Sequence, residues 1–106
     1  MTSGATFHAV IPYVKIQISP HALLRAVERG THPLEIEEVL ATGTLQPARQ
    51  GRQCTKKLFR IEEERQGRLF TQKLVEVYHV TEGDAIVVVT VYVFFGTGES
   101  RNEDRI

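Results

Sequence analysis

The sequence predicts an α+β fold in which an N-terminal pair of helices packs on a three- to four-stranded antiparallel sheet. Helix start and stop residues fall in the first half of the chain, at residues 19–30 and 33–43. Apolar runs fill the second half, with Gly67 and Gly83 in the short connections between them. Because neither two helices nor a small sheet can bury its apolar side alone, packing the helices on one sheet face satisfies both.

The first helix is predicted at residues 20–29. Ser19 is the expected N-cap, Pro20 suits the first helical position, and Gly30 ends the helix. The expected buried stripe consists of Leu23, Leu24 and Val27, with the small Ala22 and Ala26 beside it.

The second helix is predicted to start at Pro33, to carry Glu35 near the positive end of its dipole, and to end at Gly43. Its expected buried side consists of Leu34, Ile36, Val39 and Leu40. Residues 44–53 contain few apolar side chains and are expected to form a loop.

Four stretches have the pattern of strands. Residues 13–18 alternate apolar and polar side chains, as a half-buried strand or extended arm does. Strands are also predicted at residues 54–63 and at residues 70–80, where Leu74, Tyr78 and Val80 share one face. Residues 85–95 are apolar on both faces, which predicts a central strand covered on both sides.

The chain of 106 residues is long enough for one domain, predicted at residues 13–96. Residues 1–12 are expected to form a loose leader and residues 97–106 a polar, flexible tail. No signal peptide is recognisable, and the apolar stretch at residues 85–95 is too short to span a membrane as a helix. The single Cys54 excludes an internal disulfide framework. A soluble, cytoplasmic protein with no membrane partner is therefore expected.

The net charge is zero, but the basic residues are concentrated in one part of the chain. Residues 44–73 contain eight basic and three acidic side chains, a local charge of +5. Such a surface favours a phosphate-bearing partner. The alternative is a solvated sheet edge whose lysines and arginines prevent aggregation.

The first helix carries His21, Arg25 and Arg29, which are spaced by four residues and therefore share one side. Cations in a row can receive phosphates, and a histidine can exchange protons near neutral pH. The alternative is an amphipathic helix whose polar side contains Arg–Glu pairs.

These residues carry a family resemblance. The motif H-x-x-x-R-x-x-E-R-G is formed by His21, Arg25, Glu28, Arg29 and Gly30. It is followed by an acidic helix that starts with proline, then by a basic strand, a hairpin and the strand at residues 87–92. The chain thereby resembles, over residues 19–95, a bacterial family of small domains of unknown function that open with such a helix. That family is similar in topology to the RelE and BrnT toxins of toxin–antitoxin systems.

The resemblance implies a RelE-like fold and a metal-independent endoribonuclease of the mRNA interferase type, without a cofactor. The ribose 2′-hydroxyl attacks the adjacent phosphorus, so such a site needs a base, cations and an acid. The implied catalytic residues are Arg25 and Arg60 as cation clamps and His21 as proton shuttle. The implied substrate-binding residues are Arg29, Lys57, Lys73 and Tyr92. The implied partners are RNA, an antitoxin protein and a second copy of the chain.

Other interpretations stay open. A non-catalytic protein-binding or oligomerisation module would use the sheet edge and the acidic helix, and a small regulatory domain would have no chemistry. Tyr92 also fits a core residue with its hydroxyl at the rim. His79 fits a hydrogen-bonded strand histidine, and Cys54 fits an inert strand cysteine. No metal site is predicted, because the histidines and Cys54 lack zinc-ligand spacing.

Overall fold

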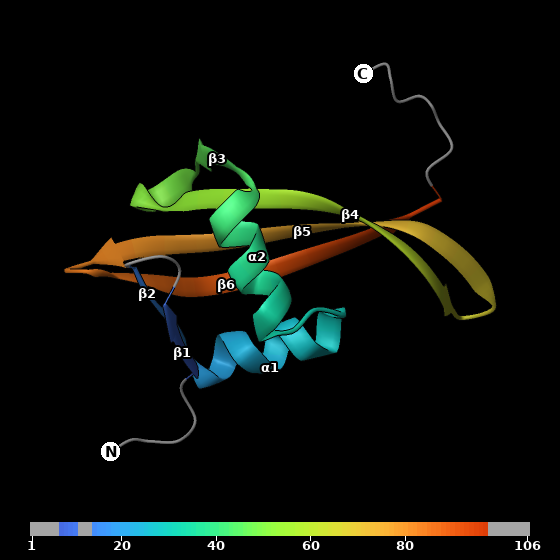
Figure 1. Ribbon diagram of the computed structural model, residues 1–106, viewed down its shortest axis with the longest axis horizontal. Helices are drawn as coiled ribbons and strands as arrows, with labels where there is room; N and C mark the ends of the chain where they lie inside the picture. Colours follow the sequence, from blue (N-terminus) through green and yellow to red (C-terminus); the bar gives the residue numbers. More distant parts are fainter. Residues whose placement is uncertain (1–6, 11–13, 98–106) are drawn as a thin grey trace.

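Two helices pack on one face of a single sheet, in the order predicted (Figure 1). The structure, a computed structural model, describes residues 7–10 and 14–97. Its elements are β1 (Phe7–Val10), β2 (Lys15–Ile18), α1 (Pro20–Arg29), α2 (Pro33–Thr42), β3 (Thr44–Pro47), the 3₁₀ turn η1 (Arg49–Gly51), β4 (Gln53–Arg65), β5 (Arg68–Glu82) and β6 (Ala85–Gly96). The predicted α+β class is confirmed.

Among the described residues the sheet has six strands, where three to four were predicted, in the order β1-β2-β6-β5-β4-β3. The pairing of β2 with β6 is parallel and the other pairings are antiparallel, as predicted for the whole sheet. The predicted meander of β4, β5 and β6 forms its centre. Two predictions need correction, because β1 lies in the expected leader and β3 lies in the expected loop. The other residues of the leader and the tail from residue 98 onward lie outside the described residues.

Helix α1 has the predicted ends. The Ser19 hydroxyl accepts a hydrogen bond from the Ala22 backbone N–H at 3.1 Å, and Gly30 ends the helix with φ of 103°. A side chain at Gly30 would meet the Phe95 ring, since a Cβ there would lie 3.0 Å from it. Glycine therefore satisfies both the left-handed backbone and the close approach of the sheet.

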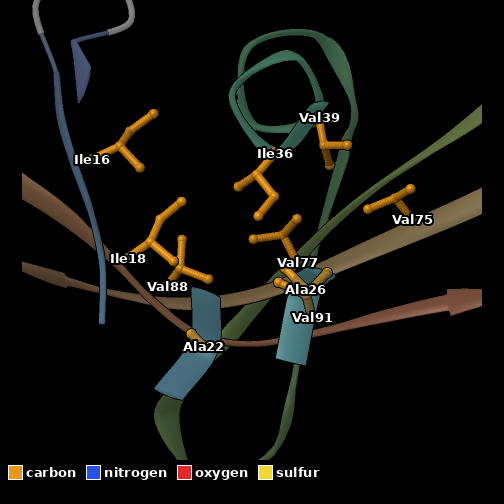
Figure 2. Packing of buried hydrophobic residues seen from close by; sticks show 10 residues of the cluster. All are labelled: Ile16, Ile18, Ala22, Ala26, Ile36, Val39, Val75, Val77, Val88 and Val91. Carbon is orange, nitrogen blue, oxygen red and sulfur yellow. The ribbon is translucent and has the colours of Figure 1, made fainter. Parts of the chain in front are cut away.

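The core lies between the helices and the sheet (Figure 2). It contains Ile16, Ile18, Ala22, Ala26, Ile36, Val39, Val75, Val77, Val88 and Val91. The predicted stripe of α1 is largely wrong, because Leu24 and Val27 are 54% and 61% exposed and Leu23 only packs at the margin. Small Ala22 and Ala26 face the sheet instead, which lets the helix lie close to β6. On α2, Ile36 and Val39 are buried as predicted, whereas Leu34 is exposed.

The other sheet face, here called the open face, carries no helix of the described part of the chain. Along β5, Val75 and Val77 point into the core, so Leu74 and Tyr78, which were predicted to share a face, both point to the open face. Strand β6 is central in the sheet, but Tyr92 and Phe94 are exposed on its open side. The expectation that β6 is covered on both sides is therefore wrong. Within the described ranges, neither helix has the length and apolar character needed to cross a lipid bilayer.

Candidate functional site

A hollow of about 410 Å³ lies on the open face, where the chain after β3 returns beside β4. Its floor comes from neighbouring positions of three strands, because Cys54 pairs with Tyr78 and Tyr78 pairs with Thr90. We call it the open-face hollow; it is lined by Gln46, Pro47, Ala48, Arg49, Gln50, Arg52, Cys54, Tyr78, Thr90 and Tyr92.

One wall of the open-face hollow is a tight turn with two arginines, Arg49 and Arg52. The Ala48 N–H donates to the Arg52 carbonyl at 3.0 Å, which closes the turn. Between them Gln50 has φ of 62°, the left-handed region that non-glycine residues rarely adopt. A backbone conformation of this kind persists only where the surrounding structure holds it in place.

Two tyrosines, Tyr78 and Tyr92, also line the open-face hollow. The Tyr78 and Tyr92 rings meet edge to face, with centroids 5.6 Å apart and an interplanar angle of 88°. The Tyr78 hydroxyl donates to Glu76 Oε1 at 3.3 Å. Burial is the main cause that raises the pKa of Tyr78 to about 12, with a smaller contribution from the nearby Glu76 carboxylate. Tyr78 therefore stays protonated at neutral pH.

Arg29 reaches this site from the end of α1. Its guanidinium donates to the Val91 carbonyl at 2.8 Å and lies 4.7 Å from the centroid of the Tyr92 ring. The Arg29 side chain can pass the edge of β6 because β2 pairs with β6 only as far as Val88. Beyond that point no described strand covers this edge of β6. The structure thus brings together two of the predicted substrate-binding residues, Arg29 and Tyr92, at the rim of the open-face hollow.

The three predicted catalytic residues are not brought together. His21 is exposed on α1, and Arg25 on the same helix pairs with Glu28 at 2.8 Å. Arg60 lies on β4 and lines a separate, shallow hollow with Ile61, Glu62 and Thr71. Strand β5 separates β4 from β6, the strand against which α1 packs. The expected common cleft of His21, Arg25 and Arg60 is therefore absent from the described residues.

Two predicted substrate-binding lysines point to the helix side of the sheet, where they are already engaged. Lys73 is 5% exposed, and its ammonium contacts Glu35 Oε1 at 2.7 Å and donates to the Gly30 carbonyl at 3.0 Å. Lys57 donates to Glu38 and Thr42 of α2, each at 2.8 Å. Both lysines tie the helices to the sheet, on the side away from the open-face hollow.

Cys54 and His79 are both buried. Burial is the main cause that raises the pKa of the Cys54 thiol, and it outweighs the neighbouring Tyr78 hydroxyl and Lys56, which lower this pKa. His79 Nε2 shares a 2.8 Å hydrogen bond with the Thr55 hydroxyl, and its buried Nδ1 has no partner among the residues that the structure describes. Burial lowers the pKa of His79. Among the described residues, no group of histidine, cysteine, aspartate and glutamate side chains is arranged to hold a metal ion.

Sequence reasoning misses Arg49, Arg52 and Tyr78 as site residues. The available indication was the pair of arginines around Gly51, directly before a strand. It could not be interpreted without knowing that residues 44–47 form an edge strand, which folds this turn over the open face.

The assembled site combines three arginines with two aromatic rings. Arginine binds phosphate through paired N–H donors, and aromatic rings stack on nucleobases. The Cys54 thiol and the Tyr78 hydroxyl have raised pKa values, so neither exchanges protons readily near pH 7. The geometry suits binding of an anionic, aromatic ligand better than proton transfer.

Comparison of the chain with models of known protein families, with characterised proteins and with solved structures finds no match.

Proposed function

We propose that this protein binds single-stranded RNA at the open-face hollow. The observation that carries the proposal is the Arg29 guanidinium, held by the Val91 carbonyl over the Tyr92 ring at the rim of the hollow. Arg49 and Arg52 stand in the wall of the same hollow. Arginines that neutralise phosphates and aromatic rings that stack on bases are the two components of single-strand recognition.

The side chains around Arg29 support this role. Its guanidinium uses one N–H for Val91, with Thr90 Oγ1 at the limit of hydrogen-bond distance, 3.5 Å. An arginine side chain has five N–H donors in a fixed planar fork, so donors remain for a phosphate. The bond to Val91 fixes the guanidinium before the ligand arrives, which reduces the entropy that binding costs.

RNA cleavage, implied by the family resemblance, is the more demanding form of the proposal. It requires a base for the 2′-hydroxyl and an acid for the leaving oxygen. The arginines of the open-face hollow can stabilise the negative charge that builds up on the phosphate oxygens during attack. His21 is exposed on α1 and does not line this hollow. We therefore propose binding as the primary activity, and cleavage as an activity to be measured on the same bound RNA.

A protein-binding module is the second candidate function. One observation favours it: Pro20, Leu23, Leu24 and Val27 line an apolar hollow of about 380 Å³ on the outer side of α1. Apolar side chains gathered on a helix surface are typical of protein contacts.

The binding experiment is a fluorescence anisotropy titration of a labelled, unstructured RNA octamer at low and moderate salt. Removing one phosphate contact or one stacking ring costs about 1–3 kcal/mol, so we expect Arg29→Ala and Tyr92→Ala each to lower the affinity about tenfold. The matched controls are Arg25→Ala and His21→Ala, which change exposed groups of the same helix and should leave binding unchanged. If the wild-type protein binds no RNA at either salt concentration, the proposal is wrong and the second candidate is favoured.

Gel analysis of the same RNA after incubation tests cleavage. Products that disappear in His21→Ala or Arg25→Ala would support the catalytic residues that the resemblance implies. Products that disappear only in Arg29→Ala or Tyr92→Ala would place the chemistry at the open-face hollow.

A further inference from the structure

Phe94 is a large aromatic side chain that the protein leaves in contact with solvent. It is 53% exposed on the open face, two residues after Tyr92 on β6. Residues two apart on a strand lie on the same face, about 7 Å from each other. The intervening Val93 packs against the core on the other face. Tyr92 and Phe94 therefore stand side by side on the same face.

The surroundings of Phe94 differ from those of the open-face hollow. In the sheet register Phe94 pairs with Leu74, and Leu74 pairs with Leu58 on β4. These three side chains form an apolar row across the open face, next to the row of Tyr92, Glu76 and Lys56. Phe94 is the one aromatic ring of the apolar row, and it lies on the same strand as the stacking ring of the proposed site.

We infer that Phe94 is a second stacking platform, so that a single strand of nucleic acid runs along β6 with one base at the Arg29–Tyr92 pair and the next base on Phe94. This inference rests on the proposed function, because Tyr92 and the arginines provide the first contact. Two exposed rings at strand spacing can receive neighbouring bases of an extended chain. A base has an aromatic face whatever its identity, so such a platform binds without strong sequence preference.

Charge complementarity favours a nucleic acid over a protein as occupant. Three arginines, Arg29, Arg49 and Arg52, lie in or at the rim of the hollow at one end of this path, and Arg60 lies on β4 beyond the apolar row. A phosphate backbone that follows β6 would start among the three arginines of the hollow and then pass the two aromatic rings, whereas Arg60 stands two strands away on β4. An apolar protein surface would find the same row without needing those cations.

The test separates aromatic stacking from simple apolar contact. Wild-type protein and the variants Phe94→Leu and Phe94→Tyr are titrated with the labelled RNA octamer by fluorescence anisotropy. Leucine keeps an apolar side chain but has no ring, so we expect Phe94→Leu to lower the affinity about tenfold, whereas Phe94→Tyr stays within about twofold of the wild type. Leu69→Ala removes an equally exposed apolar side chain from the distant β4–β5 hairpin and should change nothing. Thermal melting confirms that each variant is folded.

The outcomes distinguish this inference from the proposed function. If Tyr92→Ala loses RNA while Phe94→Leu binds like the wild type, the hollow binds RNA by itself and the Phe94 platform is refuted. If Phe94→Leu and Phe94→Tyr lose affinity equally, stacking does not explain the role of Phe94 and the inference is also refuted. If the wild-type protein binds no RNA, the proposed function fails first and the inference fails with it.

Discussion

Replacing Lys73 by methionine should destabilise the fold strongly. The Lys73 and Glu35 side chains are only 6% and 18% exposed, and their charged atoms lie 2.7 Å apart. The same ammonium donates to the Gly30 carbonyl at the end of α1, and the Thr31 hydroxyl donates to Glu35 at 2.7 Å. The pair thus joins β5 to the junction of both helices.

The magnitude follows from what the substitution leaves behind. Methionine fills similar space but leaves the Glu35 carboxylate buried without its cation, which costs about 3–5 kcal/mol. A domain of this size is stable by about 5–15 kcal/mol, so the loss is a large share of the total. The double variant Lys73→Met/Glu35→Gln removes both charges and keeps an acceptor for Thr31, and we expect it to regain about 2 kcal/mol.

Urea denaturation followed by circular dichroism measures these changes. The matched control is Lys57→Met, which also removes a lysine between sheet and helix. Its partner Glu38 is 51% exposed, so the loss should be under about 1 kcal/mol. If Lys73→Met costs no more than Lys57→Met, or if the double variant regains nothing, the buried pair does not stabilise the fold as argued.

Three further predictions follow from backbone strain and burial. Gly30→Ala should lower the free energy of unfolding in urea by about 1–3 kcal/mol, since φ is 103° and the new Cβ would lie 3.0 Å from the Phe95 ring. Gly67 also has a positive φ but has open space around it, so Gly67→Ala should cost less. Equal losses in the two variants would contradict the packing argument. Burial lowers the pKa of His79, so around and below pH 6.5, the usual pKa of histidine, the unfolded state binds more protons than the folded state. The free energy of unfolding should therefore fall as pH drops from 7 towards 5, by at most about 1.4 kcal/mol per pH unit. His79→Gln should flatten this pH dependence, and an unchanged slope would rule out His79 as its source. The Cys54 thiol is 1% exposed and its pKa is raised, so it should react slowly with a disulfide reagent. At pH 8 we expect its modification to be at least about tenfold slower in the folded protein than in the guanidinium-unfolded protein. Equal rates would show that the thiol is accessible in the folded protein.

Local sequence patterns predicted the elements that local chemistry defines. Ser19, Pro20 and Gly30 gave α1 its observed ends, because capping depends on neighbours within a few residues. Strands β1 and β3 could not be predicted in the same way. They are four residues long, and their pairing with β2 and β4 depends on partners that a single-chain pattern does not identify.

The side of α1 that faces the sheet shows a second limit of pattern reasoning. Leu24 and Val27 fit the expectation that large apolar side chains are buried, yet Ala22 and Ala26 are the buried pair. The helix lies close beside β6, and only small side chains fit there. The distance between α1 and β6 is set by tertiary packing, so the pattern of apolar residues in the helix alone does not reveal it.

The candidate site was predictable only in part. The motif helix and the last strand predict Arg29 and Tyr92, whereas Arg49 and Arg52 reach the hollow that Tyr92 lines only through β3 and the turn after it. His21, Arg25 and Arg60 are residue types that one RNA-cleaving site could combine. They lie, however, on elements that the sheet order separates. Spacing along a helix predicts which residues share a side; it does not predict what that side faces.

The most direct test of the central claim is a two-dimensional ¹H–¹⁵N NMR titration of the wild-type protein with the RNA octamer. Binding at the open face predicts the largest shift changes at Tyr78, Thr90, Tyr92 and the turn that carries Arg49 and Arg52, with little change along the outer side of α1. Shift changes centred on His21 and Arg25, or none at all, would contradict the account.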